Sequence, residues 1–276
     1  MSRSADIDCI RAALEAVACL IARIDSRRVE VTHRENGDVT TALDHAINRV
    51  LLEHLRPYGD GWLSEENEDD LARLDAVRVW VVDPIDGTRE FVEGIPEWCV
   101  SVGLIEDHQV SAGGVLNPST GELFLGSVET GLSIISPTKC YPTPANNLPR
   151  ALVSRREHKN GIWNKFENNG FAIEPVGSIA YRLALVAAGY ASATCTFEPR
   201  NEWDVAAGVA LLRAASGHVQ MSNGNDLSFN QSSFVIHSCL AFASDCPSSI
   251  RRHFCTCAKG QEYGDHRLHE RRMERA

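Results

Sequence analysis

A short apolar segment that ends in two acids sets the strongest constraint on this chain. Residues 77–82 are dominated by Val and Trp, which favours a buried strand, and residues 83–87 then read DPIDG. Pro and Gly end a strand, so the two carboxylates fall in one tight turn. Strand ends are where folds of mixed strands and helices form their sites. The segment therefore predicts a buried sheet that carries a charged site at one end.

The acids of this turn have two explanations. Asp83 and Asp86 stand three residues apart, so their side chains can converge across a tight turn, with the carbonyl of Ile85 between them. Oxygen ligands of this kind suit a hard cation such as Mg²⁺. An ordinary Asx turn, in which an aspartate caps its own backbone, explains the same residues equally well. The turn alone does not decide between the two.

Helical periodicity and short apolar runs place the other elements. Apolar residues at helical spacing predict helices over 6–24 and 40–56, the second beginning close to Asp44. Further strands are expected over 98–105, 110–116, 122–125, 151–154 and 172–176, and helices over 178–188 and 204–215. Because strands alternate with helices, we expect an α+β first half and an α/β second half.

Composition suggests two halves and a tail. Residues 136–149 are rich in Pro, Asn and Thr, which places the boundary there and gives halves over 1–138 and 139–254. The second half is expected to supply one metal ligand and the substrate contacts. From Arg251 the chain is charged and almost without an apolar period, so residues 255–276 are expected to form an exposed, flexible tail.

Charge and hydropathy exclude several classes of protein. Acidic residues number 37 against 27 basic ones, a formal net charge of −10, whereas a nucleic-acid binder needs a basic face. No apolar run approaches the roughly 20 residues of a membrane span, and acids stand too early for a signal peptide. The nine scattered cysteines suit reduced thiols better than a disulfide framework. We therefore expect a soluble cytoplasmic protein.

Three further acids stand near predicted element ends. Glu65 follows a Gly-Trp turn, Asp44 opens one helix and Asp204 opens another. Each has a plain structural explanation, since Glu65 begins an acidic run and the two aspartates are good helix caps. Together with Asp83 and Asp86 they supply enough carboxylates for a phosphate site with more than one metal ion.

Three segments carry a family resemblance by their order and separation: GWLSEE at 61–66, WVVDPIDGTREF at 80–91 and NEWDVAAG at 201–208. The chain resembles the inositol monophosphatase family of Mg²⁺-dependent, lithium-sensitive phosphatases, from the first helix to about Phe254. The resemblance implies the layered αβαβα sandwich of sugar phosphatases. Family members often dimerise, so a homodimer is the expected assembly. Residues 34–38 depart from the family pattern, and the hairpin near a third metal is expected to differ.

The resemblance implies a site with two or three Mg²⁺ ions. Glu65, Asp83 and the carbonyl of Ile85 would hold one ion, and Asp83, Asp86 and Asp204 a second. Metal ions held in this way allow water to attack phosphorus directly. The rival phosphatases that attack with an aspartate use a D-x-D spacing, whereas here two residues separate the acids.

The resemblance also implies roles around the metal ligands. Asp44 and Thr88 fall where the family positions and activates the attacking water, and Glu65 is expected to assist them. Gly87 and Thr88 fall where the family backbone meets the phosphate. These residues complete the predicted catalytic machinery.

Residues 88–91, Thr-Arg-Glu-Phe, point to one branch of the family. They are similar to the branch that hydrolyses 3'(2'),5'-bisphosphate nucleotides such as adenosine 3',5'-bisphosphate, as is the segment around Ser178. A second phosphate needs cations, and Arg155, Arg182 and Arg200 are the candidates, although each has a plain explanation as a surface arginine. The expected substrate is this nucleotide.

Two alternatives stay open. The first is an inositol-1-monophosphatase, although Phe197 stands where that branch has an acid that contacts the sugar. The second is a non-catalytic protein that binds a metal or a partner on the same fold. The first alternative predicts a preference for inositol phosphate, and the second predicts binding without turnover.

Overall fold

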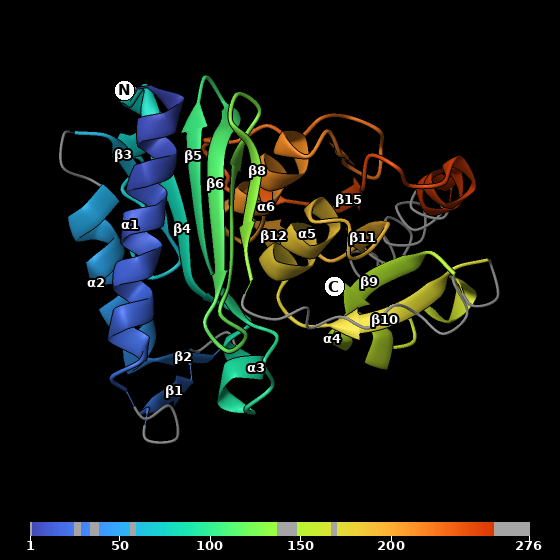
Figure 1. Ribbon diagram of the computed structural model, residues 1–276, viewed down its shortest axis with the longest axis horizontal. Coiled ribbons are helices and arrows are strands. Elements are labelled where there is room, and N and C mark those ends of the chain that lie inside the picture. The colour runs from blue at the N-terminus through green and yellow to red at the C-terminus, as the bar shows by residue number, and fades with distance from the viewer. Residues whose placement is uncertain are drawn as a thin grey trace, which may run out of the picture.

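Two β-sheets and the helices around them arrange the chain in five layers (Figure 1). The computed structural model describes residues 2–24, 29–33, 39–55, 59–136, 148–166 and 170–256. The layers are a helix pair, a six-stranded sheet, a second helix pair, a five-stranded sheet and a last layer of short helices. The αβαβα sandwich is therefore confirmed.

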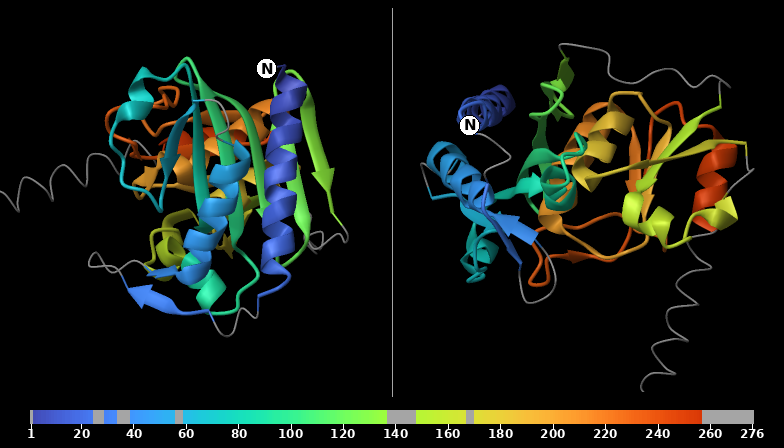
Figure 2. Two further views of the ribbon diagram at one scale, coloured as in Figure 1. Left: turned by 90° about the vertical axis from the view of Figure 1, so that its left-hand side faces the viewer. Right: turned by 90° about the horizontal axis from the view of Figure 1, so that it is seen from below.

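The first layer consists of α1 (Arg3–Ile21) and α2 (Ala42–Leu55), which lie side by side on the outer face of the larger sheet (Figure 2). Their apolar residues recur every three or four positions, so each helix turns one stripe toward the sheet. Ile10, Leu14 and Leu51 are fully buried in this layer. Both predicted helices are confirmed, with small shifts at their ends.

The larger sheet is built mainly of antiparallel neighbours. β3 and β4 pair in parallel, and each later strand pairs antiparallel with the next. In their order in the sheet the strands are β3 (Gly61–Ser64), β4 (Arg78–Asp86), β5 (Cys99–Glu106), β6 (Gln109–Asn117), β7 (Glu122–Ser127) and β8 (Gly131–Ile135). β4 is buried along almost its whole length, which explains its run of Val and Trp. β4 to β7 were predicted, whereas the short strands β3 and β8 were not.

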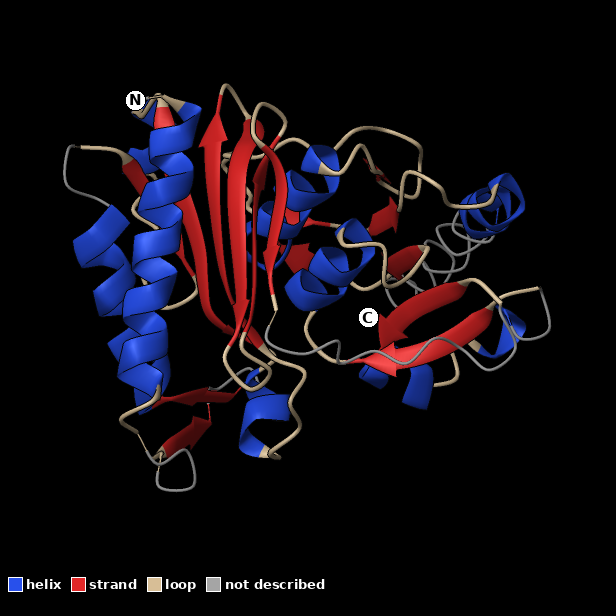
Figure 3. Ribbon diagram, viewed as in Figure 1, coloured by secondary structure: helices blue, strands red, loops and turns tan. Residues whose placement is uncertain are grey.

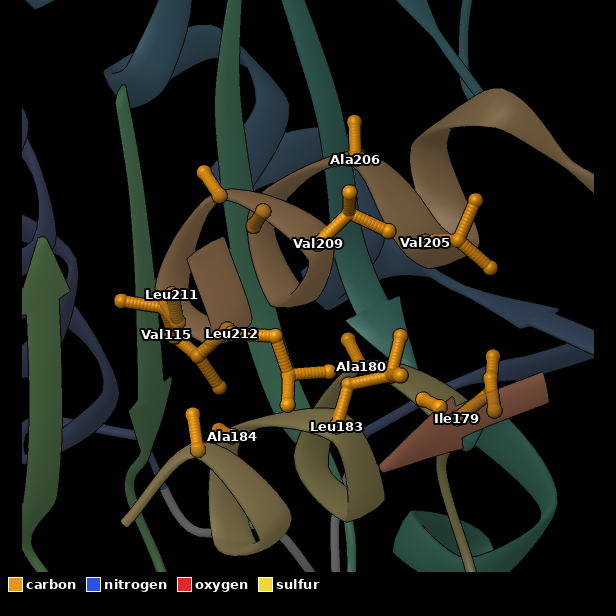
Figure 4. Packing of buried hydrophobic residues seen from close by; sticks show 14 of the residues in the cluster. Val115, Ile179, Ala180, Leu183, Ala184, Val205, Ala206, Val209, Leu211 and Leu212 are labelled. Carbon is orange, nitrogen blue, oxygen red and sulfur yellow. The ribbon is translucent and has the colours of Figure 1, made fainter. Parts of the chain in front are cut away.

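Helices α5 (Ile179–Ala187) and α6 (Glu202–Ala214) form the central layer, between the two sheets (Figure 3). Their apolar side chains pack against each other and against the larger sheet (Figure 4). The approach is close, because a Cβ at Gly208 would lie 2.4 Å from the Cβ of Leu183. This packing fixes the first turn of α6, where Asp204 stands.

The smaller sheet forms the fourth layer. Its strands, in order, are β10 (Ala172–Val176), β9 (Arg150–Ser154), β11 (Ala193–Thr196), β15 (Cys239–Phe242) and β13 (His218–Gln220). β9 pairs in parallel with both β10 and β11, as the α/β expectation for the second half requires. β15 pairs antiparallel with β11 and β13.

Short elements complete the chain, and several of them border the site described below. The strand pairs are β1 (Val31–His33) with β2 (Val39–Thr41), and β12 (Arg200–Asn201) with β14 (Val235–Ile236). The short helices are α3 (Thr88–Val92), α4 (Arg155–Lys159) and the 3-10 helices η2 (Ala72–Asp75) and η3 (Asn164–Phe166). α4 follows directly on β9, and a single residue, Gly87, separates α3 from the end of β4.

A helix lies directly before the expected tail. A helix covers residues 248–256, and its Ile250 and Phe254 are buried. The ring of Phe254 lies 5.3 Å from that of Phe166, centroid to centroid. These two apolar residues stand four apart, so they form one helical stripe that the surrounding charges hide in the composition. The helix therefore reaches two residues into the expected tail, and the flexibility of that tail stays a prediction, because residues 257–276 lie outside the described part of the chain.

Several expectations are left as they were. The boundary between residues 138 and 139 and the segment 34–38 lie outside the described residues, so the division into halves stays a prediction. Within the described part of the chain, no helix combines the length and the apolar character needed to cross a membrane. The cytoplasmic location and the homodimer also stay predictions.

Candidate active site

The acidic turn lies at the end of β4, where the pairing with β5 shifts. Asp83 stands opposite Ser101 and Asp86 opposite Cys99, so three steps along β4 match two along β5. In a regular strand, residues three apart face opposite sides of the sheet, and the extra residue of this bulge reverses that alternation. The bulge therefore brings the two carboxylates to the same side.

The Asx turn is also present. The backbone N–H of Ile85 donates to Oδ1 of Asp83 at 3.0 Å. The turn and a metal site are therefore compatible explanations, because one hydrogen bond leaves Asp83 further lone pairs to offer. The local cap orients the carboxylate that the cluster uses.

Asp204 joins the two aspartates from the first turn of α6. Its Oδ2 accepts a hydrogen bond of 2.8 Å from the backbone N–H of Asn201, which closes the helix start and orients the carboxylate. One carboxylate oxygen of each of Asp83, Asp86 and Asp204 lies within 4.8 Å of the other two. These three residues, together with Glu65 after β3, are called the acidic cluster below.

Burial raises the pKa of each of the three aspartates of the acidic cluster, and neighbouring negative charges add to the rise for Asp83 and Asp204. Burial is the largest cause of the raised pKa of Asp83, and the charges of Glu65, Asp86 and Asp204 follow. Burial, together with the charge of Asp86, raises the pKa of Asp204 to about 7. A divalent cation would neutralise this repulsion, and carboxylate oxygens are the ligands that Mg²⁺ prefers. The donor set therefore fits a divalent metal.

Thr88 and Ile85 interact at the start of α3. Oγ1 of Thr88 donates to the carbonyl oxygen of Ile85 at 2.9 Å. Because the hydroxyl proton is used in this bond, Oγ1 has only lone pairs to offer to a water molecule. The carbonyl oxygen has a second lone pair, which is available to a cation. Gly87 makes this sharp turn with a φ of 94°, in the left-handed region that favours glycine.

Ser178 holds Asp86 in place, a function that the sequence analysis missed. Its Oγ donates to Oδ2 of Asp86 at 2.5 Å and accepts from the backbone N–H of Tyr181 at 3.0 Å. The thiol of Cys99 lies 3.3 Å from Oγ of Ser178. The backbone N–H of Ala180 donates to Oδ2 of Asp86 at 2.7 Å. One donor and two acceptor sites exhaust a serine hydroxyl. These bonds turn the hydroxyl toward Asp86, while Ser178 also lines the pocket described below, so its expected contact with the substrate stays a prediction.

Asp44 is the one predicted site residue that does not line the pocket described next. It is buried, and its Oδ2 accepts hydrogen bonds from the N–H of Thr41 at 2.7 Å and from its Oγ1 at 2.6 Å. Burial raises the pKa of Asp44 to about 6. The charge of Glu66 adds to this rise. Asp44 therefore takes up and releases a proton close to neutral pH.

A cavity of about 480 Å³ lies over the acidic cluster. Acidic and basic side chains share its wall. Its lining includes the predicted residues Glu65, Asp83, Ile85, Asp86, Gly87, Thr88, Arg155, Ser178, Arg182, Arg200 and Asp204. Arg156 also lines it and was not predicted, although it directly follows a predicted arginine. A pocket with both charges suits a substrate that is itself an anion and that reacts beside a cation.

Arg182 and Arg155 are held by different kinds of partner. Arg182 is 2% exposed, and it donates to the carbonyl oxygen of Ser178, to Thr194 Oγ1 and to the carbonyl oxygen of Cys195. Arg155 forms a two-bond pair with Glu97, at 2.8 and 2.6 Å. Glu97 also accepts from the N–H of Gly177 at 2.8 Å.

Arg200 has looser contacts. It lies 3.4 Å from Thr196 Oγ1 and 3.6 Å from Oε2 of Glu198. Together with Arg155, Arg156 and Arg182 it forms what is called the arginine group below.

Comparisons with known proteins agree with this geometry. The model of the inositol monophosphatase family matches residues 2–254. A 3'-phosphoadenosine 5'-phosphate phosphatase from Mycobacterium bovis is 32% identical over 217 residues, which cover 74% of this chain and 77% of the relative. An inositol-1-monophosphatase from Mesorhizobium japonicum is 30% identical over 250 residues, which cover 84% of this chain and 91% of the relative.

A solved structure shows the same fold. CysQ from Bacteroides thetaiotaomicron, described as a bacterial member of the inositol monophosphatase family, superposes with a TM-score of 0.72 at 23% identity. The match covers 87% of this chain and 97% of that one. This structure supports the fold, and the family model over residues 2–254 and the relatives at 30% identity or more show that the chain belongs to the inositol monophosphatase family and is a phosphomonoesterase with an acidic metal site.

Proposed function

We propose that this protein removes the 3'-phosphate of adenosine 3',5'-bisphosphate, with two or three Mg²⁺ ions bound at the acidic cluster. One observation carries the proposal: a single pocket is lined by a cluster of carboxylates and by several arginines. The carboxylates suit the metal ions of a phosphatase, and guanidinium groups suit a second phosphate. The 32% identity to a 3'-phosphoadenosine 5'-phosphate phosphatase supports the same substrate.

Asp83, Asp86, Asp204, Glu65 and the carbonyl of Ile85 would hold the metal ions. When bound, the ions would neutralise the phosphate and lower the pKa of a nearby water molecule. Asp83 is buried among these acids, and the charges of Glu65, Asp86 and Asp204 all raise its pKa. The protein orients the set through the β4 bulge and through the hydrogen bonds to the aspartates.

Thr88 and Asp44 would prepare the attacking water. Thr88 Oγ1 donates its proton to the carbonyl of Ile85, so it accepts a hydrogen bond from water and orients it. The pKa of Asp44, about 6, matches a group that accepts a proton near neutral pH. The water oxygen would form a bond to phosphorus, the ester P–O bond would break, and the leaving oxygen would take a proton from solvent.

Inositol 1-phosphate is the second candidate substrate, because an inositol-1-monophosphatase covers more of this chain at 30% identity. The structure favours the nucleotide over it. Phe197 stands where that branch has a sugar-binding acid, and its ring lies 5.3 Å from Trp163 and 6.0 Å from Phe166, in an aromatic cluster. The neighbouring acid, Glu198, is paired with arginines. The non-catalytic alternative is set aside, because the chain is a phosphomonoesterase.

Phosphate release from the purified protein tests this proposal. Adenosine 3',5'-bisphosphate and inositol 1-phosphate would be compared at equal Mg²⁺, each with an EDTA control. We expect a higher kcat/KM for the nucleotide and loss of activity with both substrates in EDTA. A preference for inositol phosphate would replace the proposed substrate, and activity that survives EDTA would overturn the assigned metal site.

A further inference from the structure

The arginine group is not uniform, and its members have different amounts of charge to offer a ligand. Arg182 is buried and donates to three protein oxygens, so it ties α5 to β11. Arg155 presents two N–H groups to Glu97, which fixes the turn at Gly177 beside the pocket. Both arginines have a structural function that their contacts already explain.

Arg156 and Arg200 are arranged differently, because they share one carboxylate oxygen. Nη2 of Arg156 lies 3.0 Å from Oε2 of Glu198, and Nη2 of Arg200 lies 3.6 Å from the same atom. One carboxylate therefore holds two guanidinium groups together against their mutual repulsion. Because Glu198 offsets only one of the two positive charges, the group of three side chains itself carries a net positive charge.

The two guanidinium groups are also accessible. The side chains of Arg156 and Arg200 are 55% and 23% exposed, and both residues line the pocket over the acidic cluster. They reach it from separate elements, α4 and β12, and β12 leads directly into α6 and Asp204. A ligand bound at the acidic cluster can therefore extend to them without leaving the pocket.

We propose that Arg156 and Arg200, bridged by Glu198, form the subsite for a second phosphate group of the substrate. A phosphate dianion matches two guanidinium forks in charge and in hydrogen-bond geometry. The bridge lowers the conformational entropy that is lost when the phosphate binds, because the two arginines are already held close together. The inference rests on the proposed function, and it identifies the residues that distinguish a bisphosphate from a monophosphate.

The experiment compares two substrates that differ only in this group. Adenosine 3',5'-bisphosphate carries the second phosphate and adenosine 3'-phosphate lacks it, while the reacting ester is the same. In Arg156→Gln and Arg200→Gln we expect kcat/KM for the bisphosphate to fall about 10- to 100-fold, the usual loss for a charged hydrogen bond. The value for adenosine 3'-phosphate should stay within about 2-fold of wild type.

Two controls separate the subsite from general effects of charge. Arg213→Gln removes the same charge from the far end of α6, where Arg213 donates a hydrogen bond to Gln109. This variant should leave kcat/KM unchanged for both substrates. Because Arg200 also lies near Asp86 and Asp204, the Mg²⁺ concentration for half-maximal activity is measured with adenosine 3'-phosphate. An unchanged value excludes a metal-binding cause.

The outcomes distinguish the inference from the proposed function. If wild type prefers the bisphosphate and both variants lose only that preference, the subsite is supported. If wild type prefers the bisphosphate but the variants lose activity equally on both substrates, or lose none, the inference is wrong and the proposed function stands. If wild type shows no preference for the bisphosphate, the proposed substrate itself fails and the subsite fails with it.

Discussion

The acidic cluster and the arginine group share one pocket, but the fold builds them in different ways. Short side chains form the acidic cluster, and backbone features aim them: a bulge for Asp83 and Asp86, and a helix start for Asp204. Long side chains form the arginine group, and acidic partners such as Glu97 and Glu198 aim them. The difference indicates that the backbone fixes the acidic cluster, whereas Arg156 and Arg200, the two arginines proposed to bind a second phosphate, are held by a side-chain bridge.

Asp83→Asn tests the backbone-built region and should have the largest effect. Asp83 is buried at the centre of the acidic cluster, so its loss should reduce kcat/KM for every phosphomonoester by more than about 100-fold, since even partners that only support a ligand are worth 10–100-fold. The melting temperature without metal should stay equal or rise, because a buried negative charge is removed. Asp226→Asn, at an exposed position, is the matched control. Near-normal turnover in Asp83→Asn would contradict the metal assignment.

Leu211→Ala shows what loss of packing looks like when the site itself is untouched. Leu211 is fully buried in the layer between the larger sheet and α5 (Figure 4). We expect the free energy of unfolding to fall by about 2–5 kcal/mol, with kcat unchanged at temperatures where the variant is folded. Leu74→Ala, which is 37% exposed, should cost much less. Denaturant titration measures the free energy of unfolding of both variants. Equal decreases in the two would contradict the assigned core.

Ser178→Gly tests the hydrogen bond that joins Ser178, at the start of α5, to Asp86 at the end of β4. The change removes the hydroxyl that donates to Asp86, and glycine still adopts the positive φ of 49° found there. We expect about a 10-fold lower kcat and a higher Mg²⁺ requirement with both substrates, because Asp86 loses an orienting partner. Ser178→Ala should add a loss of stability from the strained backbone. A change in KM for the bisphosphate alone would instead assign Ser178 to substrate binding.

The sequence predicted the acidic cluster better than the arginine group, for a physical reason. Asp83 and Asp86 follow a strand with local signals, and Asp204 begins a helix, so their positions depend on neighbours in the chain. The bulge that makes the two aspartates converge depends on pairing with β5, and no local pattern reports it. The family resemblance supplied the order of the ligands, and the backbone supplied the geometry.

The remaining features depend on contacts between distant residues. Arg155 is separated by 58 positions from Glu97, and Ser178 by 92 positions from Asp86, so propensity and spacing cannot report these bonds. The helix over 248–256 was hidden because its charged composition outweighed two spaced apolar residues. Such features require the folded chain, whereas strand ends and helix starts do not.

The acidic cluster also predicts how stability depends on pH, the smallest effect considered. The pKa of Asp204 is about 7 in the folded chain, against about 3.9 for an unperturbed aspartate, so without metal the folded state binds a proton more tightly than the unfolded state. Stability is therefore lost as the pH rises from about 4 through 7. In EDTA we expect the melting temperature to be a few degrees lower at pH 8 than at pH 5.5, and Mg²⁺ to recover the difference at pH 8. In EDTA, Asp204→Asn should reduce the difference in melting temperature between pH 5.5 and pH 8. An unreduced difference would place the cause of the pH dependence outside the acidic cluster.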